Sequence, residues 1–265
     1  MSEEALVGPE LRRRLSISLL AGIPLFLAYE YGVAATAAAG DPLRNSSELL
    51  LSQLIELPGG GAGWRYLGLA IVLGFAGLRA ALQRWPLGEG AIWSLLEGAG
   101  LGLVLGPLMM LLLGLLGWLP GEQLISGGAG GGPGIEYMAL VVGGAVWEEL
   151  LFRFVLYAAV LAVVASLAKP FVSEEGPPEL LGEVLAVLLT SLAFAAAHLE
   201  SVLSWLGKGG EAYDFDLFAW RAFAGVALAV IARTRGLGVA IWTHAVFNVG
   251  LALGSGPGVF LIEPR

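Results

Sequence analysis

Long apolar stretches separated by short polar ones dominate the chain. A stretch of about 17 to 25 apolar residues can cross a bilayer as a helix. The pattern predicts such helices near 15–38, 66–84, 91–118, 135–168, 182–199, 217–232 and 237–254. The fourth stretch is too long for one simple crossing, so we expect it to be tilted, bent or continued beyond the membrane. We predict an all-α fold, a polytopic transmembrane bundle of about seven to eight membrane helices around a polar cavity.

Two shorter patterns add detail to this bundle. The segment "RNSSELLLSQLIELPGGG" opens with Asn45 and Glu48 spaced as in a capping box and stops at Pro58, which predicts a short helix at the membrane interface. In the third apolar stretch Gly98, Gly102 and Gly106 recur every four residues. Such a stripe of small residues lets another helix approach closely.

The composition supports a membrane protein and excludes several functions. The 265 residues are 57% hydrophobic and only 14% charged, well outside the range of ordinary soluble domains, and we treat residues 1–265 as a single integral-membrane domain. The net charge of −8 excludes a nucleic-acid partner, because phosphate binding needs clustered basic residues. The absence of cysteine excludes disulfides, thiolate nucleophiles and cysteine-based metal sites.

The basic residues outside the apolar stretches predict an orientation. With the N-terminus inside, the inner side carries Arg12, Arg13, Arg14, Arg79, Arg84, Lys169, Arg233 and Arg235. The outer side carries only Arg44, Arg65, Lys208 and Arg265. Because inner loops are enriched in Lys and Arg, this distribution favours a cytoplasmic N-terminus.

Charged residues interrupt the fourth apolar stretch in "VWEELLFRFVLYAAV", residues 146–160. Each charge near the centre of a bilayer costs roughly 2.5 to 3.5 kcal/mol on insertion scales. Glu149 and Arg153 are four residues apart on a helix and can form an ion pair that offsets this cost. Glu148 points to a neighbouring face and has no such local partner, which favours a functional role.

Both histidines of the chain also lie in apolar stretches. His198 ends "SLAFAAAH", one turn after Phe194, and His244 lies one turn before Asn248 in "AIWTHAVFN". A single histidine in a membrane helix is more often a packed, hydrogen-bonded residue than a catalyst, and Asn248 alone could be a contact between helices. Glu30, Glu97 and Arg221 also lie in or near these stretches, and we assign them no catalytic role.

Taken together, the polar residues of these three helices contain the parts of a hydrolase. Glu148 can take a proton from water, a histidine can orient that water, and His244 with Asn248 can donate to an oxyanion. Other catalytic plans do not fit, since the chain has no Gly-x-Ser-x-Gly and no His-Glu-x-x-His motif. Asp41, Asp214 and Asp216 fall in loops, which argues against an intramembrane aspartyl pair.

The segments "EELLFR" (148–153), "FAAAH" (194–198) and "HAVFN" (244–248) resemble three ordered motifs of one family. These are the Glu-Glu-x-x-x-Arg, Phe-x-x-x-His and His-x-x-x-Asn motifs of the CPBP, or Abi, intramembrane glutamic endopeptidases, which include Rce1-type CAAX prenyl endopeptidases. The resemblance covers about residues 136–253, which we expect to form the catalytic core. It implies a helical bundle around a conical cavity and peptide hydrolysis without a metal or cofactor.

By this resemblance, Glu148 and His198 would activate water, and His244 and Asn248 would form the oxyanion site. Glu149 and Arg153 complete the first motif. The implied partners are the lipid bilayer and a lipidated or membrane-associated protein substrate, cleaved near its C-terminus or membrane anchor. We expect an integral protein of the cytoplasmic membrane of a prokaryote.

Two alternatives stay open from the sequence. One is a zinc-dependent membrane protease, because His198, His244 and a glutamate could supply three protein ligands. The other is a non-enzymatic scaffold, immunity factor or transporter whose buried polar residues join helices or line a pathway. Neither alternative requires a change in the predicted fold.

Overall fold

The protein is all-α in a computed structural model that describes residues 16–38, 43–56, 64–83, 87–118, 134–168, 178–206 and 210–255. Its elements are α2 (Ile23–Ala38), α3 (Ser46–Glu56), α4 (Trp64–Leu82), α5 (Leu87–Leu115), α6 (Ile135–Glu149), the π-helix η2 (Leu150–Leu156), α7 (Tyr157–Ala168), α8 (Pro178–Ala196), α9 (Glu200–Leu203), the 3₁₀ turn η3 (Ser204–Leu206), α10 (Phe215–Arg235) and α11 (Leu237–Ser255). Within these ranges there is no strand, only an isolated bridge between Leu199 and Glu211. The predicted fold class is confirmed.

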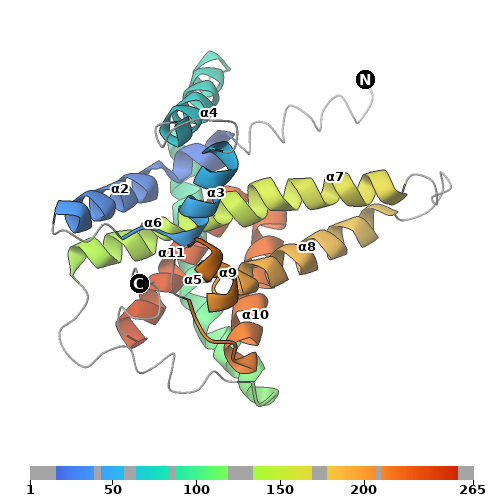
Figure 1. The fold of residues 1–265 in the computed structure, drawn as a ribbon. Helices are drawn as coiled ribbons and strands as arrows, with labels where there is room; N and C mark the ends of the chain where they lie inside the picture. Colours follow the sequence, from blue (N-terminus) through green and yellow to red (C-terminus); the bar gives the residue numbers. More distant parts are fainter. Residues whose placement is uncertain are drawn as a thin grey trace.

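Each apolar stretch predicted from the sequence corresponds to a helix of the described residues. Ser16–Ala38, Gly88–Leu115 and Phe215–Arg235 are long and apolar enough to span a bilayer. Leu73–Leu82, Leu180–Ala196 and Leu237–Leu253 are shorter apolar helices. The fourth stretch is one long rod in which α6, η2 and α7 follow without a break (Figure 1).

Apolar side chains cover the outside of the bundle as well as its interior. On α5, Leu103 is 70% exposed and Leu111 is 61% exposed. A soluble protein rarely exposes a continuous surface of this kind, whereas lipid tails solvate it without cost. This surface is that of an integral membrane protein.

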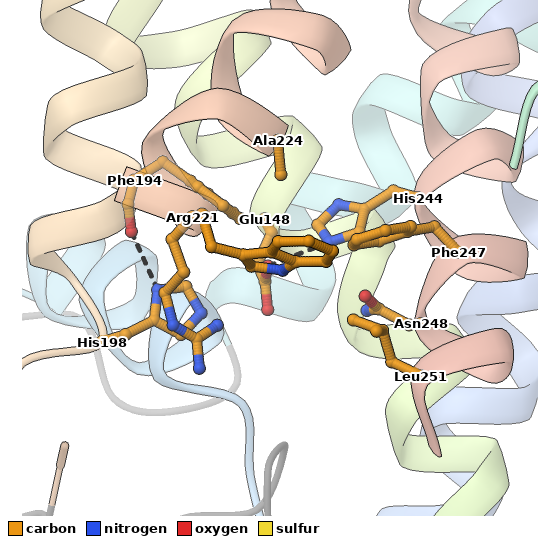
Figure 2. Close-up of a pocket in the computed structure, with 10 residues that line it drawn as sticks. Glu148, Phe194, His198, Arg221, Ala224, His244, Phe247, Asn248 and Leu251 are labelled. Atoms are coloured by element: carbon orange, nitrogen blue, oxygen red, sulfur yellow. Dashed lines mark hydrogen bonds and ion pairs between the residues drawn. The ribbon is translucent and has the colours of Figure 1, made fainter. Parts of the chain in front are cut away.

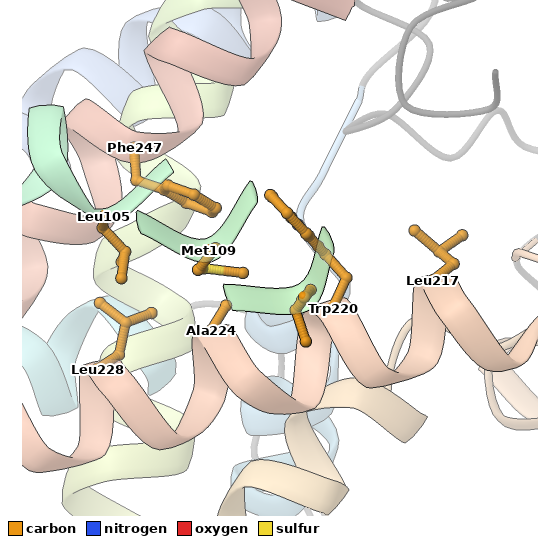
Figure 3. Packing of buried hydrophobic residues seen from close by; sticks show 8 residues of the cluster. Leu105, Met109, Leu217, Trp220, Ala224, Leu228 and Phe247 are labelled. Atoms are coloured by element: carbon orange, nitrogen blue, oxygen red, sulfur yellow. The ribbon is translucent and has the colours of Figure 1, made fainter. Parts of the chain in front are cut away.

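The packing order of the helices brings the three polar segments together. α6 packs between α2 and α11, α11 packs on α5, and α8 packs on α10. One apolar cluster joins α5, α10 and α11 through Leu105, Met109, Leu228, Trp220 and Phe247 (Figure 3). The helices that carry the polar residues therefore pack against a tightly filled apolar core.

The glycine stripe of α5 makes the close contact that the sequence predicts. A Cβ atom added to Gly98 would lie 2.8 Å from the Val239 carbonyl oxygen. One added to Gly102 would lie 2.7 Å from the Thr243 carbonyl oxygen. Glycine is needed at both positions because α11 passes directly over them.

The short helix predicted after Asn45 is also present. Asn45 caps α3, because its Oδ1 accepts a hydrogen bond of 2.8 Å from the Ser47 N–H. α3 lies against α6, the helix that ends in the two glutamates. Its predicted stop at Pro58 lies outside the described residues. So do Arg12, Arg13 and Arg14, and the orientation of the chain in the membrane stays a prediction.

Candidate active site

The first motif lies at the junction of α6 and η2. Glu148 and Glu149 are the last two residues of α6, and Arg153 lies in the middle of η2. The sequence predicts a long helix here that is tilted, bent or continued beyond the membrane. The backbone stays helical but widens into a π-helix for seven residues. Such segments are rare and occur frequently at functional sites.

Glu149 is fully buried and has two charged or polar partners. Its Oε1 lies 2.8 Å from Nδ1 of His244. Its Oε2 lies 3.5 Å from Nε of Arg153, so the predicted ion pair forms. Arg153 also donates to the Gly225 carbonyl oxygen at 3.1 Å and stacks over the Phe194 ring at 4.7 Å. The pair thus links η2 to α8, α10 and α11 behind the pocket.

Glu148 lies at the surface of the pocket and has one polar neighbour near each carboxylate oxygen. Its Oε1 accepts a hydrogen bond of 2.7 Å from Nδ2 of Asn45. Its Oε2 lies 3.5 Å from Nε2 of His244. The imidazole of His244 therefore lies between the two glutamates, with one ring nitrogen toward each.

The second motif places His198 just beyond the end of α8. Its Nδ1 lies 2.9 Å from the Phe194 carbonyl oxygen, so Nδ1 carries the proton and Nε2 is left as the acceptor of the neutral ring. The Phe194 ring packs edge-on against both His198 and His244, with ring centroids 5.1 and 5.8 Å away. The Phe194 ring therefore contacts both imidazoles and keeps them apart.

The third motif places His244 and Asn248 on one face of α11, as the spacing predicts. Both side chains are buried, at 3% and 6% exposure. Nδ2 of Asn248 lies 3.5 Å from the Val141 carbonyl oxygen, at the outer limit of a hydrogen bond. The protein holds this amide loosely, which leaves it able to donate to another acceptor.

Four of the six predicted site residues line one pocket (Figure 2). They are Glu148, His198, His244 and Asn248. Glu149 and Arg153 lie behind it. The cavity volume is about 50 Å³, several times the roughly 10 to 15 Å³ that one water molecule needs. The arrangement can hold water between a carboxylate, two imidazoles and an amide.

The sequence missed two polar residues at this site. Arg221, to which the sequence assigned no catalytic role, lines the pocket from α10 (Figure 2). It pairs with Glu211 through two guanidinium nitrogens. Asn45 was identified only as a helix cap, although it also binds Glu148. No local pattern could have revealed the second contact, since the two residues are 103 positions apart.

The arrangement of donor atoms bears on the zinc alternative. Among the described residues, no three His, Asp or Glu side chains are placed to share a metal ion. Both nitrogens of His244 face carboxylates, and Nδ1 of His198 is taken by a carbonyl. The side chains as placed do not fit the tetrahedral ligand set of a zinc site.

A comparison with family models gives an independent result for this part of the chain. Residues 132–250 match the model described as type II CAAX prenyl endopeptidase Rce1-like. The match covers a little less than half of the chain, and over this part the chain is similar to the Rce1-like family. The matched residues contain all three motifs, and the resemblance drawn from them is confirmed. Searches of curated proteins and of solved structures each found no significant match.

The Rce1-like match has a consequence for the general function. The matched model describes a CAAX prenyl endopeptidase, and three helices of the described residues are long and apolar enough to span a membrane. The pocket lies within the matched segment, apart from Leu251 at its edge. The match names a reaction class, and the roles of single residues must be argued from their geometry.

Proposed function

We propose that this protein is an intramembrane endopeptidase that uses Glu148 as its general base. Its substrate would be a lipidated or membrane-associated protein, cleaved near the C-terminus or the membrane anchor. The single observation that carries the proposal is the convergence of Glu148, His198, His244 and Asn248 on one pocket within the Rce1-like segment. We further propose that residues 136–253 form the catalytic core of a single integral-membrane domain.

In the first step Glu148 removes a proton from water while the water oxygen bonds to the scissile carbonyl carbon. Nε2 of His198 is oriented as an acceptor and can hold the second hydrogen of that water. The carbonyl oxygen becomes an oxyanion. A general base of this kind contributes about 10²- to 10⁴-fold in rate.

Asn248 and His244 would donate to the oxyanion through Nδ2 and Nε2. Because Nδ1 of His244 already donates to Glu149, donation from Nε2 requires a doubly protonated ring. In the second step Glu148 returns its proton to the leaving nitrogen, the C–N bond breaks, and a carboxylate and an amine are released.

The test compares two Glu→Gln variants on a prenylated CAAX peptide, with the protein in nanodiscs. Glu148→Gln should lower kcat by at least about 10²-fold while the melting temperature changes little. Glu97→Gln is the matched control, because Glu97 pairs with Arg235 at the surface of the protein and should retain full activity. Full activity of Glu148→Gln would overturn the proposal.

Cleaved termini in the membrane proteome of cells would identify the substrate. Some termini should appear in cells that express the wild type and be absent from cells that express the Glu148→Gln variant at equal abundance. These termini would identify the proteins that are cleaved. Identical termini, together with a solute flux that Glu148→Gln abolishes, would favour a transporter. Activity lost in a strong chelator and restored by zinc would favour the metal-dependent protease.

A further inference from the structure

The side chain of Asn45, the residue before α3, binds the proposed general base from outside the Rce1-like segment. Nδ2 of Asn45 donates to Oε1 of Glu148 at 2.7 Å. A hydrogen bond to an ionised carboxylate is among the stronger ones in proteins, and it favours the charged form of the acceptor. The question is whether this bond serves the reaction or only the packing of α3 on α6.

The other bonds of Asn45 fix which end of its amide faces Glu148. Oδ1 accepts the Ser47 N–H, because Asn45 is the N-cap of α3. With the oxygen used in the cap, the nitrogen must point toward Glu148. The orientation therefore follows from the bonding pattern, and Glu148 receives a donor that does not titrate.

A buried network anchors the backbone of Asn45. Its N–H donates to the Tyr29 hydroxyl at 2.7 Å, and that hydroxyl donates to Glu48 at 2.6 Å. Arg44 pairs with the same carboxylate. Tyr29 and Glu48 are both fully buried. The capping box predicted from Asn45 and Glu48 is thus closed through Tyr29 of α2, which fixes the start of α3.

The backbone of α6 has room for the amide only because it carries glycine at 144. A Cβ atom added to Gly144 would lie 2.9 Å from Nδ2 of Asn45, closer than van der Waals contact allows. Gly144 is one helical turn before Glu148 and lies on the same face of α6. Two independent features, the N-cap of α3 and Gly144 of α6, therefore direct the Asn45 amide toward the Glu148 carboxylate.

Building on the proposed function, we propose that Asn45 is a positioning residue for Glu148. By occupying Oε1, it leaves Oε2, the oxygen near His244, to take the proton from water. It also holds the carboxylate in one rotamer, so that Oε2 faces the pocket before substrate arrives. Residues that position a catalytic group in this way affect kcat more than KM.

The variants at position 45 separate positioning from capping. Asn, Asp and Ser cap helices about equally well, whereas Ala does not. Asn45→Ser keeps the cap and removes the donor to Glu148. Asn45→Asp keeps the cap and replaces the donor with a carboxylate. Asn45→Ala removes both functions, so it reports the cost of the lost cap.

The kinetic experiment measures kcat, KM, the pH–rate profile and the melting temperature on a prenylated CAAX peptide in nanodiscs. We expect Asn45→Ser and Asn45→Asp to lower kcat at least tenfold at a nearly constant KM and melting temperature. The pH–rate profile of Asn45→Asp should differ from that of the wild type, because a second carboxylate beside Glu148 repels its charge. Wild-type kcat in both variants would overturn the proposal.

A second measurement does not depend on proteolysis. Dicyclohexylcarbodiimide reacts with protonated carboxyl groups in membranes, and mass spectrometry can locate the product at Glu148. We expect faster labelling of Glu148 in Asn45→Ser and Asn45→Asp than in the wild type, at least threefold at neutral pH. Equal labelling rates would overturn the positioning role. Faster labelling of the two variants, together with a wild type that cleaves no peptide, would overturn the proposed function alone.

Discussion

The two neighbouring glutamates of the first motif have different surroundings. Glu149 is fully buried against Arg153 and His244, and Glu148 faces the pocket between His244 and Asn45. A helix turns by about 100° per residue, so adjacent side chains enter different environments. The motif therefore combines one residue that the fold needs with one that the proposed reaction needs.

Glu149→Gln tests this division at the residue scale. The change leaves Arg153 as a buried cation without its partner, and breaking such a pair typically costs about 3 to 5 kcal/mol. We expect a clear fall in the melting temperature in detergent, with activity lost as well. Glu148→Gln is the comparison, since it should lose activity with little change in melting temperature. Equal melting temperatures for both variants would contradict the assignment.

At the element scale, the distance between α5 and α11 decides where the third motif lies. Gly98 and Gly102 let the two helices touch, and Gly102 contacts the backbone at Thr243, the residue before His244. The π-helix η2 also fixes the position of a site residue, because it places Arg153 in contact with both Glu149 and Gly225. Local helix geometry thus controls how accurately the pocket is assembled.

Gly102→Ala should disturb the site without touching any polar residue. The added methyl group would lie 2.7 Å from the Thr243 carbonyl oxygen and 2.8 Å from Cβ of Val246, and overpacking of this kind costs about 1 to 3 kcal/mol. We expect lower kcat and a lower melting temperature. Gly100→Ala, on the same helix with no atom within 4 Å, should be neutral or slightly stabilising. Identical behaviour of the two variants would refute the role of the stripe.

At the scale of the whole molecule, the outer surface and the pocket have opposite character. Large apolar side chains cover the outside of α5, whereas carboxylates, imidazoles and an amide gather inside the bundle. Lipid cannot solvate those polar groups, so they bind one another or face the cavity. Contact with lipid therefore explains the apolar outer surface. The contacts among the polar groups explain how the bundle tolerates charged residues in its interior.

The depth of α5 in the bilayer can be tested with two exposed leucines. Leu103 lies near the middle of the helix and Leu115 at its end, with exposures of 70% and 77%. If lipid surrounds the helix, Leu103→Asp should reduce membrane-integrated protein strongly, because Asp at a helix centre costs about 2.5 to 3.5 kcal/mol. Leu115→Asp should have a small effect. Equal yields from the two variants would place this surface in water.

The sequence predicted most of the helices and the four polar residues Glu148, His198, His244 and Asn248 of the pocket. The lengths of the apolar stretches predicted the helices, and the four-residue spacing predicted that His244 shares a face with Asn248 and Glu149 with Arg153. Hydrophobic periodicity and helical spacing are local properties, which is why a single sequence reveals them. The three-motif resemblance then indicated which polar residues belong together, although spacing alone did not.

Only the tertiary structure decided which helices meet and with which atoms. It placed Nδ1 of His244 on Glu149 and Nε2 toward Glu148, widened the helix into η2, and brought Arg221 to the pocket. It also gave the cap residue Asn45 a second bond, to Glu148. These contacts join residues far apart in the chain, and they depend on how side chains pack between helices, which no local pattern of apolar and polar positions specifies.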